Sequence, residues 1–176
     1  MIYQLARDRT AEISTATLGL SRPVTERLRL AGDLSVMQTS ASVASGGVEA
    51  TPATDDEYFI SLQAIGTGVL NGDDISSLGL RYSDTTSVSS IGLYASSRLP
   101  VGRHWRYYPR LRIDQRTWKT GDQNQWLLGP MVRVEYTWDK MTFEAEIGGE
   151  WTNHEMPDVT ERTTGTYGSL GYRYEF

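Results

Sequence analysis

Residues 125–151, QWLLGPMVRVEYTWDKMTFEAEIGGEW, decide the fold because their character alternates at every second position. One set of alternate positions is apolar or aromatic: Trp126, Leu128, Pro130, Val132, Val134, Tyr136 and Trp138, then Met141, Phe143, Ala145, Ile147, Gly149 and Trp151. Successive side chains of a β-strand point to opposite faces of the sheet. The stretch therefore predicts two antiparallel strands, joined by a tight turn, with one apolar and one polar face.

The same alternation recurs along the chain, whereas helical periodicity is nearly absent. It predicts nine strands, over residues 11–21, 25–38, 57–70, 75–84, 88–99, 104–118, 124–138, 139–152 and 164–176. Residues 2–9 are interpreted as a tenth strand, with a short helix as the alternative. These strands are longer than the usual five or six residues. Their length suits tilted strands that cross a membrane, which need about 9–11 residues.

The connections between these strands fall into two sets that alternate along the chain. Compact turns are expected at 21–25, 71–74, 99–104 and 137–140, and the other set lies at 39–56, 84–87, 119–123 and 152–163. The longest, 39–56, is of low complexity and is predicted to be flexible. Short turns at one end and mostly longer loops at the other are typical of outer-membrane β-barrels.

The composition excludes several classes of protein. The chain of 176 residues contains no cysteine, which removes disulfides, thiol catalysis and cysteine metal sites. Its net charge of −5 argues against a nucleic-acid partner. The first ten residues, MIYQLARDRT, lack the apolar region of a signal peptide. Any export signal is therefore expected outside this sequence, which leaves open that the chain is a fragment.

Aromatic residues on the apolar faces sort into two levels. Trp105, Tyr107, Tyr136, Trp138, Tyr174 and Phe176 fall near the short turns, and Tyr58, Tyr82, Trp126 and Trp151 fall near the longer loops. Aliphatic residues occupy the positions between them. Two aromatic girdles around an aliphatic band are what the lipid-facing surface of a barrel requires. The alternative is a soluble barrel or sandwich whose apolar face points into its own core.

The opposite faces of the later strands are strongly charged. Their residues are Arg106, Arg110, Arg112, Asp114 and Arg116 on one strand, Arg133 and Glu135 on the next, and Glu144, Glu146 and Glu150 on a third. A basic strand would thus face an acidic strand across a mixed one, which predicts cross-strand ion pairs in a lumen. The charges either pair and pack the lumen or create a field that steers solutes.

The last residues, SLGYRYEF, resemble the C-terminal signal of bacterial outer-membrane proteins, with Ser169, Gly171, Tyr174 and Phe176 at the matching positions. The resemblance implies recognition by the outer-membrane assembly machinery. Four motifs, LPVGRHWRYYPRLRIDQR, QWLLGPMVRVEYTW, FEAEIGGEW and LGYRYEF, resemble the C-terminal barrel of uncharacterised proteobacterial outer-membrane proteins with upstream periplasmic tetratricopeptide repeats. In related architectures the repeats recruit a cargo that the barrel passes to the surface. This chain lacks the repeats, so the resemblance implies a periplasmic repeat partner outside it.

Candidates for chemistry are few. His104 is expected in a short periplasmic turn, and His154 in the outer loop beside Glu155 and Asp158, where a rim site is conceivable. The acidic run 55–57 is a weak candidate for a cation site, and a solvated acidic loop is the commoner alternative. No phosphate-binding glycine loop occurs. We predict no catalytic residue, no metal and no cofactor.

These observations predict an all-β protein: a single domain, 1–176, that forms an antiparallel up-and-down transmembrane β-barrel of nine or ten strands, or the C-terminal part of a larger barrel. Residues 1–10 are its first strand or a linker. The expected location is the bacterial outer membrane, in contact with its lipid. The predicted function is a pore or an export component with an ionic lumen. The alternatives are a structural or adhesive surface barrel and an outer-rim membrane enzyme.

Overall fold

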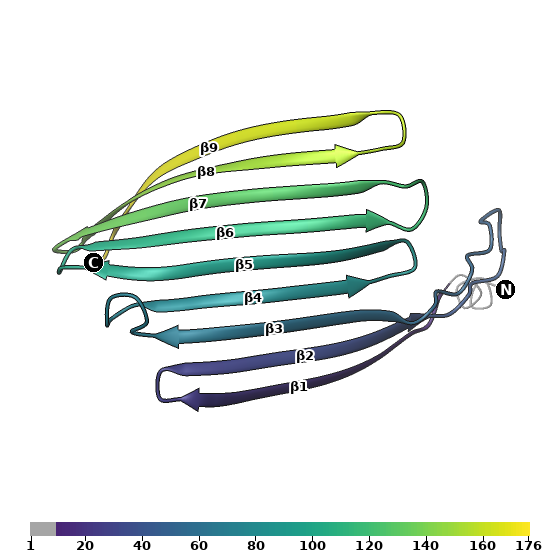
Figure 1. Ribbon diagram of the computed structural model, residues 1–176, viewed down its shortest axis with the longest axis horizontal. Coiled ribbons are helices and arrows are strands. Elements are labelled where there is room, and N and C mark those ends of the chain that lie inside the picture. The colour runs from purple at the N-terminus through teal and green to yellow at the C-terminus, as the bar shows by residue number, and fades with distance from the viewer. Residues whose placement is uncertain (1–9) are drawn as a thin grey trace.

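The computed structural model describes residues 10–176, and all of their regular secondary structure is β-sheet. The strands are β1 (Ile13–Thr25), β2 (Leu28–Thr39), β3 (Glu57–Thr67), β4 (Ile75–Asp84), β5 (Val88–Val101), β6 (Trp105–Trp118), β7 (Asn124–Trp138), β8 (Met141–Glu155) and β9 (Thr160–Tyr174). Each pairs antiparallel with the next, so the order in the sheet is the order in the chain (Figure 1). The predicted all-β, antiparallel, up-and-down architecture is confirmed. Within the described range, no helix is long and apolar enough to cross a membrane.

Most predicted strands match these bounds closely, but two connections differ markedly. Residues 21–25, predicted as a turn, belong to β1, and the turn lies at Glu26 and Arg27. Pro23 fits because β1 is an edge strand of the described sheet, where a missing N–H is tolerated. The loop predicted at 152–163 shrinks to 156–159, because β8 and β9 extend their ladder to Glu155 and Thr160. The tenth strand predicted at residues 2–9 lies outside the described residues.

The C-terminal strand also ends earlier than predicted. β9 stops at Tyr174, although the backbone N–H of Glu175 still donates to the carbonyl oxygen of Lys140 at 2.9 Å. Phe176 lies beyond the ladder and is fully exposed. Its ring meets that of Tyr174 edge to face, with ring centroids 5.3 Å apart. The last aromatic is therefore held by a ring contact rather than by strand pairing.

The connections alternate between two ends of the sheet (Figure 1), with 26–27, 68–74, 102–104 and 139–140 at the short-turn end and 40–56, 85–87, 119–123 and 156–159 at the long-loop end. The longest connection lies at the long-loop end as expected, but 68–74 exceeds the other three there, so the predicted contrast in length holds only in part. The long loop between β2 and β3 is more ordered than its composition suggested. Ser42 pairs with Thr51 and Ser45 pairs with Val48, which makes a small hairpin. Gly46 and Gly47 have φ of 56° and 83°, and two consecutive positive φ angles are what a tight hairpin turn requires. The prediction of a flexible loop missed this glycine-directed turn.

The two faces of the sheet differ sharply in polarity and in exposure. No apolar side chain is buried within residues 10–176. On the apolar face Leu20 is 77% exposed, Ile147 69% and Leu170 88%, whereas Glu135 on the polar face is only 8% exposed. A curved sheet shields the side chains on its concave side, so the polar face is the concave one. The alternative of a soluble barrel with an apolar core is contradicted by this arrangement.

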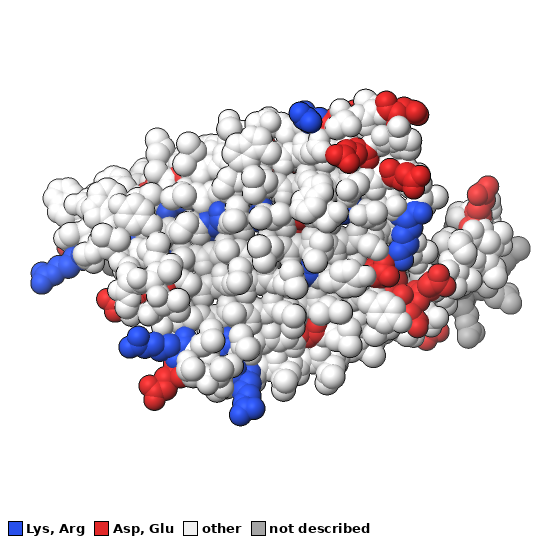
Figure 2. All heavy atoms as spheres, in the orientation of Figure 1, with Lys and Arg blue, Asp and Glu red and all other residues white. Residues whose placement is uncertain are grey.

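Figure 2 shows uncharged atoms over most of the sheet in this view and acidic side chains gathered at the long-loop end.

The outer edges of β1 and β9 do not pair with each other in the described residues. Both strands run from the long-loop end to the short-turn end, because nine strands alternate in direction. Direct pairing of β1 with β9 would therefore be parallel, unlike every other pair in the sheet.

The connection between β3 and β4 is organised by one buried carboxylate. Asp74 is 1% exposed and accepts hydrogen bonds from the hydroxyl of Ser76 at 2.6 Å and from the backbone N–H groups of Leu70 at 2.8 Å and Asn71 at 3.2 Å. These donors, with Ser76 the largest contributor, hold the pKa of Asp74 below its ordinary value of 3.8. The ionised carboxylate thus satisfies two backbone N–H groups of this connection, beside the backbone hydrogen bond from Gly68 N–H to the carbonyl oxygen of Asp74.

We expect Asp74→Asn to lower the urea midpoint for unfolding of the refolded protein at neutral pH, because an amide nitrogen cannot accept these hydrogen bonds. The folded-state pKa of Asp74 is depressed, so its contribution is present above pH 3.8 and is lost as the pH falls through the folded value. The difference in urea midpoint between wild type and Asp74→Asn should therefore become smaller under strongly acidic conditions. Equal midpoints at neutral pH would contradict this role.

Candidate functional site

The candidate site is the polar face of β6, β7 and β8, where the register brings the predicted charges together. Arg106 of β6 lies opposite Glu135 of β7, which lies opposite Glu144 of β8. The remaining charged positions share this face: Arg110, Arg112, Asp114 and Arg116 on β6, Arg133 on β7, and Glu146 and Glu150 on β8. The alternation read from the sequence therefore places all ten charges on one surface.

The ion pairs on this surface run along the strands rather than across them. Arg133 Nη2 pairs with Glu135 Oε1 at 2.7 Å, and Arg112 Nε pairs with Asp114 Oδ2. Residues two apart on a strand lie on the same face, within reach of an arginine side chain. The prediction of cross-strand pairs between the basic and acidic strands was wrong. β6 and β8 are two strand spacings apart, or about 10 Å, and the arginines that do pair meet a carboxylate on their own strand instead.

Tyr108, Arg133 and Glu135 form a compact cluster near the short-turn end. The Tyr108 hydroxyl donates to Glu135 Oε2 at 2.8 Å, and the Arg133 guanidinium lies 4.8 Å from the centre of the Tyr108 ring. Each member contacts the other two, so the carboxylate is satisfied on both oxygens. The cluster braces β6 against β7 and leaves Glu135 little freedom to meet a solute.

The remaining charges are free to act on the space above the sheet. Within residues 10–176, no ion pair engages the β6 arginines Arg106, Arg110 and Arg116 or the β8 carboxylates Glu144, Glu146 and Glu150. β7 separates the two rows. The concave surface therefore carries a positive row and a negative row that face each other across a strand.

A hollow of about 460 Å³ lies on the sheet between these rows. Arg110 and Arg112 line one side, Glu150 lines another, and Tyr94 and Tyr167 flank it. Gly148 makes room for one of these rings, since a Cβ there would lie 2.5 Å from Tyr167 Cζ. The hollow thus offers cationic, anionic and aromatic contacts to one solute.

Polar-face residues on the earlier strands, which were not among the predicted site residues, extend this surface. Arg81 of β4 lies with its guanidinium carbon 5.0 Å from the centre of the Tyr94 ring, and Ser61 donates to Asp33 at 2.6 Å. These four residues widen the polar face to β2–β5. The signal was present in SLGLRYSD, residues 77–84, where Arg81 alternates with Leu80 and Tyr82.

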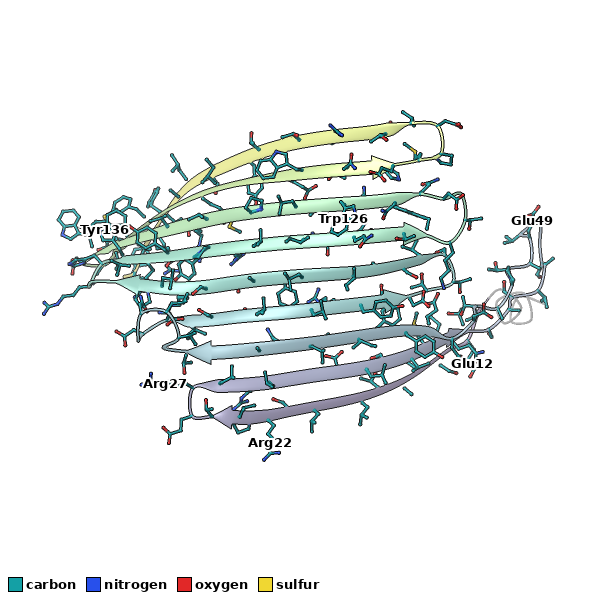
Figure 3. The ribbon with its side chains drawn as sticks, in the orientation of Figure 1. Glu12, Arg22, Arg27, Glu49, Trp126 and Tyr136 are labelled. Atoms are coloured by element: carbon teal, nitrogen blue, oxygen red, sulfur yellow. The ribbon has the colours of Figure 1, made fainter. Side chains whose placement is uncertain are left out.

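Aromatic residues gather on the apolar face at the two levels described above. At the short-turn end Trp105 contacts both Tyr136 and Tyr107, with ring centroids 4.7 Å and 6.3 Å away. Phe143 and Tyr172, absent from the predicted girdle, continue this row across β8 and β9. Figure 3 shows Tyr136 at this end and Trp126 toward the other end of the same strand. Tyr58, Tyr82 and Trp151 also lie near the long-loop ends of their strands, whereas Trp138 and Tyr174 lie near the short-turn end.

The histidines do not form a catalytic arrangement in the described residues. His154 belongs to β8, not to the loop in which it was predicted, because the β8–β9 ladder continues past it. The centroid of its ring lies 5.1 Å from that of the Trp118 ring, and its buried Nε2 has no hydrogen-bond partner. Glu155 instead accepts from the Asn153 side chain at 2.9 Å. His104 lies in the β5–β6 turn, as expected, with Nδ1 2.8 Å from the carbonyl oxygen of Thr137.

The acidic run 55–57 has a structural use. Glu57 is 9% exposed and accepts a hydrogen bond from the backbone N–H of Thr86 at 3.0 Å, which ties β3 to the β4–β5 turn. In the part of the chain that the structure describes, no three histidine or acidic side chains group as metal ligands.

Comparison with known proteins places the fold. No protein-family model and no curated protein matches the sequence. Among solved structures, the sheet is similar to in-vitro folded OmpT, an outer membrane protein of Vibrio cholerae, with a TM-score of 0.59 at 14% identity. The match covers 96% of this chain and 56% of that protein, so this chain spans little more than half of its length.

The fold and its two faces define the class. An antiparallel meander of long strands, apolar on its exposed face and charged on its concave face, is the wall of an outer-membrane type β-barrel. The structural likeness to OmpT agrees with this fold class.

Contact between Trp105 and Tyr136 should stabilise the short-turn end. We expect a double-mutant cycle with Trp105→Leu and Tyr136→Leu to give a coupling of about 0.5–1.5 kcal/mol, the usual worth of an aromatic pair. Unfolding by urea in detergent provides the measurement. A control cycle uses Trp105→Leu and Tyr58→Leu, whose residues lie at opposite ends of the sheet. Their effects on the free energy of unfolding should add to within about 0.5 kcal/mol. Equal couplings in both cycles would contradict a specific contact.

Proposed function

We propose that this chain forms the wall of a passage across the bacterial outer membrane, with its apolar face in lipid and its polar face toward the lumen. One observation carries the proposal: in the described range, Arg106, Arg110 and Arg116 on β6 and Glu144, Glu146 and Glu150 on β8 join no ion pair, and a hollow of about 460 Å³ lies between the two strands. Charges that served only to pack a lumen would neutralise one another at contact distance. Here the two rows stay apart.

Such an arrangement acts on solutes without covalent chemistry. A field across a narrow passage orients dipolar solutes and attracts both signs of charge to different walls. The proposed role is therefore passage of solutes along this wall. The long-loop end faces outward in this proposal and the short turns face the periplasm, as in known outer-membrane barrels.

The proposed function also includes recognition of β9 during assembly and delivery of cargo from the periplasm. β9 has a free edge in the described sheet and carries Leu170, Tyr172 and Tyr174 on one face. Such an edge suits pairing with a strand of the assembly machinery, for which Ser169, Gly171, Tyr174 and Phe176 are the proposed signal. The resemblance described above supports periplasmic repeats as the partner that brings cargo. An export role therefore ranks beside simple diffusion of solutes.

The membrane orientation is tested by moving one charge between the two faces of β3. Leu62 lies on the apolar face and its neighbour Gln63 on the polar face. We expect Leu62→Arg to destabilise the protein in lipid vesicles by about 2–4 kcal/mol, the cost of an arginine near the bilayer midplane. Gln63→Arg on the same strand should cost far less, because its side chain stays in water. Similar costs for both variants, measured by urea unfolding, would refute the orientation.

Passage is tested by ion selectivity in planar bilayers. We expect the triple variant Arg106→Gln, Arg110→Gln, Arg116→Gln to shift the reversal potential of the single channel toward cation selectivity. The matched triple variant Glu144→Gln, Glu146→Gln, Glu150→Gln should shift it toward anions, because each set removes one sign of charge from the wall. Channels that respond to neither change, or protein that folds without conducting, would overturn the proposed passage.

A further inference from the structure

A second hollow lies on the opposite, apolar face, near the long-loop ends of β7, β8 and β9. Its volume is about 530 Å³, within the range of small-molecule sites. Its lining includes Ile113, Leu128, Trp126 and Trp151, and at its upper margin Asn153 and Arg162. The hollow is therefore apolar along its length and polar at one end. A lipid in the leaflet on the long-loop side has its head group and its acyl chains in this same order, with the head group nearer the long loops.

The register shows how the walls are built. Asn153 lies between Trp126 of β7 and Arg162 of β9 in one row, and Trp151 lies between Leu128 and Thr164 in the next row. Gly149 lets the Trp151 ring lie toward the middle of the sheet, since a Cβ there would be 2.9 Å from the ring. Trp126 thus lies in the same row as the polar pair, and Trp151 lies one row below it, so the two rings form the apolar part of the groove.

Two groups at the polar end have no partner within the described part of the protein. Arg162 is exposed and joins no ion pair in the described part of the chain. The carboxylate of Glu155, one row further out, is engaged by the Asn153 amide nitrogen at 2.9 Å. The other amide atom, Asn153 Oδ1, is buried without a hydrogen-bond partner. A buried acceptor without a partner is costly, so a donor from outside the protein is the natural complement.

We propose that this groove binds one membrane lipid whose phosphate-bearing head group has a net negative charge. An acyl chain lies along Trp126 and Trp151, the phosphate pairs with Arg162, and a head-group hydroxyl or amide donates to Asn153 Oδ1. The proposal rests on the membrane orientation proposed above but not on passage of solutes. A guanidinium suits phosphate because its planar fork matches two phosphate oxygens. An uncharged head group would leave Arg162 uncompensated.

Tryptophan quenching tests the site. A variant with Trp105→Phe, Trp118→Phe and Trp138→Phe retains Trp126 and Trp151, two of the five tryptophans of the chain. It is reconstituted in phosphatidylcholine vesicles that contain a small fraction of lipid with brominated acyl chains. We expect brominated phosphatidylglycerol to quench more than brominated phosphatidylcholine with the same chains. Adding Arg162→Gln should reduce this preference about fivefold, the usual effect of one basic residue near a membrane surface.

Arg22→Gln is the matched control, because Arg22 also lies on the apolar face but at the short-turn end of β1. It should leave the preference unchanged. Equal quenching by the two lipids, or equal effects of Arg162→Gln and Arg22→Gln, would overturn the site. If the tryptophan variant fails to fold, native mass spectrometry can instead measure how much phosphatidylglycerol each protein retains. Arg162→Gln should retain less of this lipid than wild type, and Arg22→Gln should retain as much as wild type. Equal retention by all three proteins would overturn the site. Heat-modifiable gel mobility and the Leu62 and Gln63 comparison report separately on folding and orientation.

Discussion

In an apolar solvent every backbone N–H and C=O group must find its partner within the protein. The long antiparallel ladders of β1–β9 meet this demand for every interior strand, and the rest of the structure follows from it. Once the backbone is satisfied, the apolar side chains can point away from the protein, which explains a sheet that buries no hydrophobic side chain in its described residues. The demand also applies to the free edges of β1 and β9. Because these strands run in the same direction, antiparallel closure requires an odd number of strands between them.

Much of this fold was predictable because the period of two is written directly in the sequence. The alternation in 125–151 set both strands and the face of every residue, and the register confirmed that assignment. Strand ends were less predictable, since they depend on pairing between neighbours rather than on local pattern. Thr160 and Glu155 extend the sheet because each has a partner on the adjacent strand, although both lie in a polar stretch that reads as a loop.

The site divides in the same way. Placement of the charges on one face followed from alternation, but their partners did not. Arg133 turns along its own strand toward Glu135 and covers Tyr108, a choice made by side-chain conformation. The contact of Arg81 with Tyr94 joins neighbouring strands whose register no short-range pattern determines. Apolar and polar faces are thus properties of the sequence, whereas the unpaired rows and the two hollows are properties of the assembled sheet.

The proposed orientation has the apolar face in lipid and the polar face in water. The absence of cysteine from the chain allows a direct test with Leu62→Cys and Gln63→Cys, made separately. Both variants are refolded into lipid vesicles and exposed to a water-soluble maleimide from both sides of the membrane. We expect rapid labelling at position 63 and protection at position 62 until the vesicles are dissolved and the protein is unfolded. Labelling at position 62 with protection at position 63 would show that the apolar face is not in lipid.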